Sequence, residues 1–268
     1  MKRLVISILV LLIIAGCNGG TSTKTTLVVG MECDYAPFNW TQLEDSQTAV
    51  LIDGGQSGYA DGYDVAIAQS IADELGLELV VKKIEWDGLT MAVVNNEIDL
   101  IIAGMTDTLE RRESLTFTTP YYVSEMVLIV RSDSAYANAT NIQDFSGARV
   151  VAQLNTFHDD IIDQINGVKH ETPMLTFPLM TVALQNKVVD AMVSELPVAV
   201  SICNNNPDLI YINFTGANGF DAGDDATVSI GLAKNNADLF ASVQAALNKI
   251  TPETRIQMMA DAQERQPE

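Results

Sequence analysis

Two neighbouring arginines, Arg111 and Arg112, are the residues whose chemistry stands out most in this sequence. They follow an apolar stretch in a chain that carries 15 lysines and arginines against 35 aspartates and glutamates. A guanidinium presents a fork of N–H donors that fits both oxygens of a carboxylate. The net negative charge of an acidic protein repels a carboxylate, so a protein of this kind that binds one needs a positive group at the site. The residues alone leave a second interpretation open, in which both arginines pair with nearby acids on the surface.

The apolar stretch "IDLIIAG" (98–104) indicates where a carboxylate site would lie. It has the pattern of a buried strand, and in open α/β sheets ligands bind just beyond the carboxyl ends of strands. Gly104 allows the backbone to approach a ligand, and Thr106 offers a hydroxyl. Asp107 is expected to cap a short helix that carries the arginines, with Glu110 completing a capping box.

No common catalytic motif accompanies these residues. The sequence has no nucleophile elbow, no phosphate-binding glycine loop and no HExxH zinc motif. The stretch "HDDIID" (158–163) groups His158 with aspartates and could hold a metal, but in so acidic a chain a solvated helix face is favoured. The stretch "DAGDD" (221–225) hints at a calcium loop, yet Leu232 stands where an EF-hand needs glutamate. We therefore expect a protein that is not an enzyme and that has no metal and no cofactor.

Alternating apolar patterns predict an α/β protein. "TLVVGM" (26–31) has the pattern of a strand, and "YDVAIAQSIADELG" (63–76) that of an amphipathic helix that Gly76 ends. Further strand and helix patterns follow in turn, which predicts a parallel-type sheet with helices on both faces. A second such set occupies the middle of the chain.

We therefore predict two lobes, the second inserted into the first. Residues 27–130 and 226–268 form the first lobe in this interpretation, and residues 131–225 form the second. Two long apolar strands, near 126–131 and 226–232, are expected to cross between the lobes. Two such connections make a hinge, and hinged lobes close on ligands.

The start of the chain has the features of an export and anchoring signal. Residues 1–16 combine a basic pair with an apolar run too short to span a bilayer comfortably, which indicates a signal peptide. The box "IAGC" ends in Cys17, the predicted lipidated residue, and residues 17–26 form a polar, flexible tether. We expect a lipid-anchored protein on the extracytoplasmic face of the cell membrane. The acidic composition disfavours nucleic acid as a partner.

Two further cysteines, Cys33 and Cys203, allow one disulfide by count. They stand in very different regions of the chain, so free, buried thiols are favoured.

The stretch "AGMTDTLERRESLTFTTPYY" (103–122) resembles the signature of the family 3 solute-binding proteins, the polar amino-acid receptors of ABC importers. Five other stretches agree with that family in order: "DYAPFNW" (34–40), "GYDVAIAQSIADELG" (62–76), "WDGL" (86–89), "VVAQLNTFHDD" (150–160) and "VDAMVSELPVA" (189–199). The resemblance spans essentially the whole mature chain. It implies the two-lobed periplasmic-binding-protein type II fold, a monomer, an L-amino acid as ligand and a membrane permease as partner.

The same resemblance implies which residues hold the ligand's α-carboxylate and α-ammonium groups. Arg111 matches the arginine that clamps the carboxylate. Gly104 and Thr106 match the backbone and hydroxyl groups beside it. The start of a second-lobe helix, at Thr156 and Phe157, offers free N–H groups to a carboxylate. Glu195 matches the acid that receives the ammonium.

Four more residues are expected to bind the ligand, three of them at its side chain. Tyr35 and Tyr63 match the aromatic pair that sandwiches it, and Gln153 belongs to the matching second-lobe stretch. Glu32 stands where receptors for lysine, arginine and histidine carry an acid, so cationic amino acids are favoured. Glutamine binders can also carry an acid there, which keeps glutamine or another polar amino acid as the alternative.

Several residues depart from the family pattern. Asn155 and Phe157 replace the usual glycine and threonine, and Glu195 is one methylene longer than the usual aspartate. Residues 41–61 exceed the common loop length and are expected to form a hairpin at the cleft edge. Two other function classes stay open: a dehydratase-type enzyme on the same fold, and a sensing module, which would need a transmembrane helix after the lobes.

Overall fold

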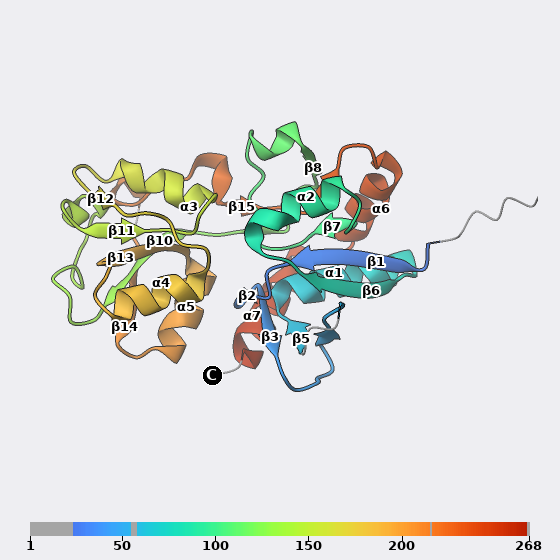
Figure 1. The fold of residues 1–268 in the computed structure, drawn as a ribbon, viewed down its shortest axis with the longest axis horizontal. Coiled ribbons are helices and arrows are strands. Elements are labelled where there is room, and N and C mark those ends of the chain that lie inside the picture. The colour runs from blue at the N-terminus through green and yellow to red at the C-terminus, as the bar shows by residue number, and fades with distance from the viewer. Residues whose placement is uncertain (1–23, 55–57, 215, 267–268) are drawn as a thin grey trace, which may run out of the picture.

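A computed structural model describes residues 24–54, 58–214 and 216–266. The predicted signal peptide (1–16), the lipidation residue Cys17 and most of the predicted tether lie outside the described residues. The described chain forms two lobes that lie side by side, with a narrow connection between them (Figure 1). None of the described helices is long and apolar enough to cross a membrane.

The first lobe is built on a five-stranded sheet in the order β6-β1-β7-β16-β8. Its strands are β1 (Thr26–Met31), β6 (Glu78–Lys83), β7 (Leu100–Ile101), β8 (Leu115–Phe117) and β16 (Gly231–Ala233). Strand β1 runs parallel to both β6 and β7, whereas β16 runs antiparallel to β7 and β8. The sheet is therefore mixed, not purely of the parallel type.

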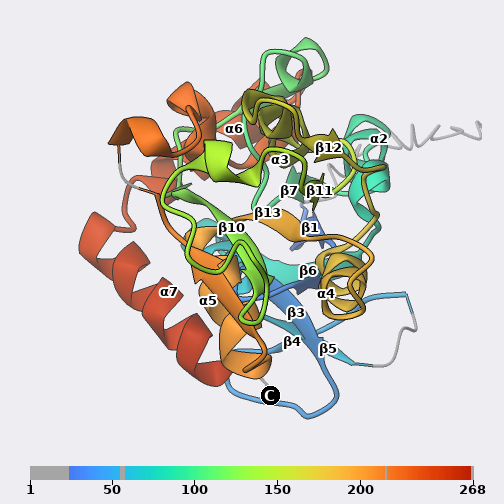
Figure 2. The same ribbon diagram turned by 90° about the vertical axis from the view of Figure 1, so that its left-hand side faces the viewer.

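Helices cover this sheet as the apolar periodicity predicts. They are α1 (Tyr63–Leu75), the 3-10 turn η1 (Trp86–Gly88) with α2 (Leu89–Val94), the turn η2 (Arg111–Glu113), α6 (Ala237–Leu247) and α7 (Pro252–Arg265). Helix α1 ends where expected, because Gly76 adopts a left-handed conformation with φ of 66° and glycine does so without steric cost. Helix α7 runs along one flank of the molecule (Figure 2).

The second lobe repeats the arrangement with a sheet in the order β12-β11-β13-β10-β14. Its strands are β10 (Met126–Arg131), β11 (Arg149–Val151), β12 (Lys169–His170), β13 (Ala191–Glu195) and β14 (Leu209–Ile212). Its helices are η3 (Ile142–Phe145), α3 (Phe157–Asp160), η4 (Ile161–Gln164), α4 (Phe177–Gln185), α5 (Leu196–Asn205), η5 (Gly216–Asn218) and η6 (Gly223–Ala226). Strand β10 runs antiparallel to β13 and β14, so this sheet is also mixed.

One of the two predicted crossings between the lobes, near 126–131, differs from the structure, whereas the other, near 226–232, contains a strand at the junction. Two short strands, β9 (Tyr122–Val123) and β15 (Thr227–Val228), pair antiparallel in a two-stranded ribbon at the junction. Strand β10, expected as a crossing and partly counted with the first lobe, is instead an interior strand of the second-lobe sheet, between β13 and β14, and is buried along its whole length. A crossing strand and an interior strand of a sheet can both be fully apolar, so the sequence pattern could not distinguish the two positions.

A small sheet in the order β2-β3-β5-β4 extends from the first lobe. It comprises β2 (Asp34–Tyr35), β3 (Asn39–Gln42), β4 (Val50–Leu51) and β5 (Tyr59–Asp61), so the long 41–61 segment does form antiparallel strands. Asp61 is buried and fixes the segment, because its carboxylate accepts hydrogen bonds from Thr48 at 2.7 Å and from Arg265 of α7 at 3.1 Å.

The lobes also pack on each other. Phe177 of α4 lies against the ring of Tyr35, with centroids 4.8 Å apart. This packing beside β2 brings the carboxyl ends of strands from both sheets to one place.

Cys33 and Cys203 are both free thiols, as predicted, although only Cys33 is fully buried.

Candidate functional site

A small cavity lies between the lobes where these strand ends meet. Its lining residues are Glu32, Tyr35, Trp86, Ala103, Gly104, Gln153, Thr156, Phe157 and His158. Predicted site residues from both lobes therefore meet in one place. The cavity volume is ≈ 10 Å³, which is about enough for one water molecule, so an amino acid would have to part the side chains that close it.

Arg111 lines a larger groove, which shares Trp86, Thr156 and Phe157 with this cavity. Its guanidinium donates to the carbonyl of Thr106 at 2.7 Å and to the carbonyl of Asn155, across the groove, at 3.0 Å. Its Cζ lies 5.0 Å from the ring centroid of Trp86, within cation–π range. Arg111 is thus a positive group that touches both lobes.

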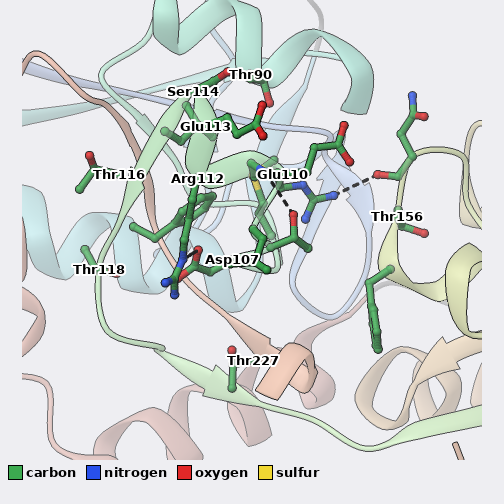
Figure 3. A pocket seen from close by; sticks show the side chains of 18 of the residues that line it. Thr90, Asp107, Glu110, Arg112, Glu113, Ser114, Thr116, Thr118, Thr156 and Thr227 are labelled. Atoms are coloured by element: carbon green, nitrogen blue, oxygen red, sulfur yellow. Dashed lines mark hydrogen bonds and ion pairs between the residues drawn. The ribbon is translucent and has the colours of Figure 1, made fainter. Parts of the chain in front are cut away.

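Arg112 has different surroundings. Its guanidinium forms a two-pronged pair with the carboxylate of Asp107, at 2.6 and 2.5 Å, and 59% of its side chain is exposed. Figure 3 shows Arg112 beside Asp107, with Thr156 on the opposite side of the groove. The predicted capping box is wrong, because Asp107 holds Arg112 and Glu110 provides no side-chain cap to η2.

Gly104 is needed for the close packing of the cavity wall. Its φ is 61°, and a Cβ atom there would lie 2.7 Å from the ring of Tyr35. Its N–H donates to the hydroxyl of Tyr121 at 3.1 Å, and that hydroxyl donates to the buried carboxylate of Asp64 at 2.6 Å. Thr106 is 92% buried and contributes its carbonyl to Arg111, without lining the cavity.

Glu195 ends β13 and stands at the start of α5, where it is 97% buried. Its Oε2 accepts a hydrogen bond from the hydroxyl of Tyr35 in the other lobe and lies 3.0 Å from Nε2 of His158. Burial alone would raise the pKa of Glu195, but the charge of His158 and the hydrogen bonds from His158 and Tyr35 hold that pKa below its ordinary value. Glu195 is therefore a buried anion.

His158 is the site residue that the sequence interpretation missed. It was expected on a solvated face, yet it is 94% buried, lines the cavity and packs edge-on against Phe177. Its Nδ1 has no hydrogen-bond partner among the described residues. The signal was present, because His158 precedes the buried Ile161 and Ile162 by three and four residues, which is the spacing of one helical face.

Glu32 follows β1 and faces the same cavity, 96% buried. Its Oε1 accepts a hydrogen bond at 2.9 Å from the side-chain amide of Gln153 in the other lobe. Burial, followed by the negative charges of Asp34, Glu85 and Asp87, raises the pKa of Glu32 from 4.5 to about 8, although the Gln153 bond opposes the shift. Glu32 is therefore a neutral acid at pH 7 in this closed arrangement.

The predicted helix start at Thr156 and Phe157 is present, since Thr156 precedes the first residue of α3. The hydroxyl of Thr156 donates to the carbonyl of Gln153 at 2.7 Å and does not cap the helix. Asn155 has a φ of 56°, a left-handed conformation that asparagine tolerates better than most residues. Asparagine therefore fits this left-handed position without a glycine.

Tyr63 does not reach the cavity. It is completely buried, donates to the carbonyl of Tyr121 at 2.9 Å and packs on Phe38. Tyr63 is therefore not placed to form the predicted aromatic pair with Tyr35 around a ligand, and the rings that pack on Tyr35 are Phe38 and Phe177.

The described residues contain no group of histidine, cysteine and acidic side chains arranged to hold a metal ion. The second histidine, His170, lies between the carboxylates of Asp159 and Asp163, each at 2.8 Å.

Comparisons with known proteins agree with this geometry. A profile of the bacterial extracellular solute-binding proteins, family 3, matches residues 27–262. A probable histidine-binding protein of Campylobacter jejuni is 29% identical over 74% of this chain and 72% of its own, and the L-cystine-binding protein of Escherichia coli is 25% identical over 89% and 82%. An amino-acid ABC transporter substrate-binding protein of Streptococcus pneumoniae, solved with L-arginine, superposes with a TM-score of 0.77 at 26% identity, over 89% of this chain and 94% of that one.

Proposed function

Because the chain belongs to the bacterial extracellular solute-binding proteins of family 3, we propose that it is the receptor of an ABC importer. In this proposal its lobes close on an L-amino acid, with cationic amino acids favoured, and it delivers the ligand to a membrane permease. The receptor acts as a monomer, and a lipid on Cys17 holds it at the extracytoplasmic face of the membrane. The relatives named above, which bind histidine, cystine and arginine by name or title, support the amino-acid class.

One observation carries the proposal: the closed cleft holds a cation and a buried anion that each bridge the lobes. Arg111, on the first lobe, reaches the carbonyl of Asn155 on the second. Glu195, on the second, is bound by Tyr35 of the first. A free amino acid carries a carboxylate and an ammonium group, so it can replace both bridges and still join the lobes. Ligand binding would then be coupled to closure.

The preference for a cationic side chain rests on Glu32 and its neighbours. Asp34, Glu85 and Asp87 all add negative potential at Glu32, and the partner that the second lobe supplies is the neutral amide of Gln153. A cationic side chain would remove this accumulation of negative charge.

A receptor for glutamine or another neutral polar amino acid is the second candidate. It is favoured by the raised pKa of Glu32, because a neutral acid can exchange hydrogen bonds with an amide without a charged partner.

A thermal-shift screen tests the proposal. The purified protein is heated with each of the twenty amino acids, ornithine and citrulline at high concentration. A ligand at 100 times its Kd stabilises the folded protein by about 2.7 kcal/mol, which is a clear increase in Tm. Arg111→Ala provides the control, since it should lose the response to every ligand. A wild-type protein that no amino acid stabilises would overturn the proposed function.

A further inference from the structure

Asn155 of the second lobe contacts the first lobe through two separate groups. Its backbone carbonyl accepts hydrogen bonds from the guanidinium of Arg111 at 3.0 Å and from the indole N–H of Trp86 at 3.2 Å. Its side-chain amide donates to the carboxylate of Asp87 at 2.8 Å. Three hydrogen bonds therefore cross the groove at this residue, and two of them reach adjacent residues of η1 in the first lobe.

The local backbone separates the part of this contact that any residue could make from the part that needs asparagine. Asn155 has a φ of 56°, and Thr156 after it is the extended N-cap residue of α3. Glycine adopts a left-handed conformation without steric cost, so it could form the same turn and offer the same carbonyl. Glycine has no side-chain amide, however. The bond to Asp87 therefore depends on the asparagine side chain and not on the turn.

The bond to Asp87 uses groups that an amino acid ligand does not need. In the proposed receptor the carboxylate and ammonium groups of the ligand bind Arg111 and Glu195. Asn155 and Asp87 are exposed residues of the groove, and neither lines the small cavity. When Arg111 gives up the carbonyl of Asn155 to bind a carboxylate, the amide of Asn155 can keep its partner. The contact therefore fits a closed cleft that holds a ligand.

We propose that the hydrogen bond between Asn155 and Asp87 is a clasp that holds the closed lobes together and retains the bound amino acid. The ligand leaves only when the lobes part, so the clasp must break before release. Association starts from open lobes, in which the two residues are apart, so the clasp has no effect on the encounter. It lowers koff and leaves kon unchanged. Asn155 is thus a positioning residue that acts through the lobes, and the inference rests on the proposed receptor function.

Asn155→Gly tests the clasp, because it removes the amide and preserves the turn. L-arginine is the probe, and stopped-flow fluorescence gives its association and dissociation rates, with Trp86 in the groove as a reporter. Loss of one hydrogen bond between exposed groups should raise koff and Kd about three- to tenfold, with an unchanged kon.

An exchange of the two partners tests the contact itself. Asn155→Asp alone places two carboxylates against each other across the groove, so koff should exceed that of Asn155→Gly, by a margin that shrinks at high salt. Addition of Asp87→Asn to this variant restores one donor and one acceptor with their roles exchanged, and koff should return most of the way to the wild-type value. Asp87 also adds negative potential at Glu32, so the coupling between the two changes decides, and not Asp87→Asn alone.

Asn96→Gly is the matched control. Asn96 is also an exposed asparagine with a positive φ, of 60°, but it lies between α2 and β7 and lines neither the groove nor the cavity. It should leave both rates unchanged, and thermal melts confirm that each variant is folded. An equal rise of koff in Asn96→Gly and Asn155→Gly would overturn the clasp, because the effect would then come from glycine in general.

The remaining outcomes separate the clasp from the receptor function. Unchanged dissociation in Asn155→Gly, a loss confined to association, or no coupling in the exchanged pair would overturn the clasp and leave the receptor function intact. If L-arginine does not bind, small-angle X-ray scattering of the protein alone decides. Asn155→Asp should then be less compact than wild type and the exchanged pair compact again, whereas equal radii of gyration would overturn the clasp. Failure of every amino acid in the thermal screen would separately overturn the proposed function.

Discussion

Replacement of Arg111 by alanine should weaken ligand binding more than any other change to this site. The side chain donates to carbonyls of both lobes, at 2.7 and 3.0 Å, so in the proposed receptor it is placed to exchange one of these bonds for the ligand carboxylate. Without it, a buried carboxylate loses its charged partner, which costs about 2–5 kcal/mol. That loss corresponds to a roughly 30- to 5000-fold rise in Kd.

The adjacent Arg112 provides a matched control from the same turn. It is a guanidinium one residue away, but 59% of its side chain is exposed and it pairs with Asp107. Exposed ion pairs contribute about 1 kcal/mol or less. Arg112→Ala should therefore raise Kd by less than about fivefold.

Calorimetry with the strongest ligand of the thermal screen compares the two variants, and thermal melts without ligand confirm that both are folded. Arg111→Lys adds a third point: it keeps the charge but not the two-pronged geometry, so its affinity should fall between wild type and Arg111→Ala. Equal losses at the two arginines, or a larger loss at Arg112, would refute the assignment and make Arg111 a structural bridge only.

Three further predictions follow from the buried acids and the chain start. Glu32→Gln should remove a pH dependence of stability: the pKa of Glu32 rises from 4.5 to about 8 on folding, so its contribution is fully present below pH 4.5 and is lost as the pH rises through about 8. Denaturant titrations should show the wild type losing on the order of 5 kcal/mol more than the variant across that window, and parallel curves would contradict the burial argument. Glu195→Gln keeps the shape and removes the charge, so it should weaken every amino-acid ligand alike without changing their rank order; an unchanged Kd would exclude Glu195 as the ammonium partner. Cys17→Ser should move the protein from the membrane to the soluble fraction, as fractionation and immunoblotting would reveal, since the predicted lipid anchor is lost.

Local patterns predicted the elements of the fold well. The helix that Gly76 ends and the strand 26–31 match the structure at both ends, because apolar periodicity and glycine conformation act over a few residues. The insertion of one lobe into the other also followed from the order of the patterns. The crossing near 126–131 did not, since the position of β10 is fixed by contacts with strands more than 60 residues away.

The site was predictable where backbone geometry places a residue and less so where side chains compete. Glu32 and Gln153 meet because each follows the end of a strand, which the pattern locates. Tyr63, which was expected beside the ligand, is buried away from the cavity. His158, which was expected on a solvated helix face, lines it. The orientation of an aromatic ring or an imidazole depends on packing and hydrogen-bond partners from other segments, which the local sequence does not contain.

The interrupted first lobe has a consequence for how the chain folds. The second-lobe sheet is complete within residues 126–212, but the first-lobe sheet needs β16, which begins at Gly231 and lies between β7 and β8. The middle of the chain can therefore reach its final structure while the N-terminal strands still wait for a neighbour that is synthesised more than 100 residues after β8. Contacts so distant in sequence form slowly, because a long loop must close first. The usual N-terminal-first order of folding is thus reversed, and a chain cut before Gly231 would lose an interior strand of its first sheet and not an edge.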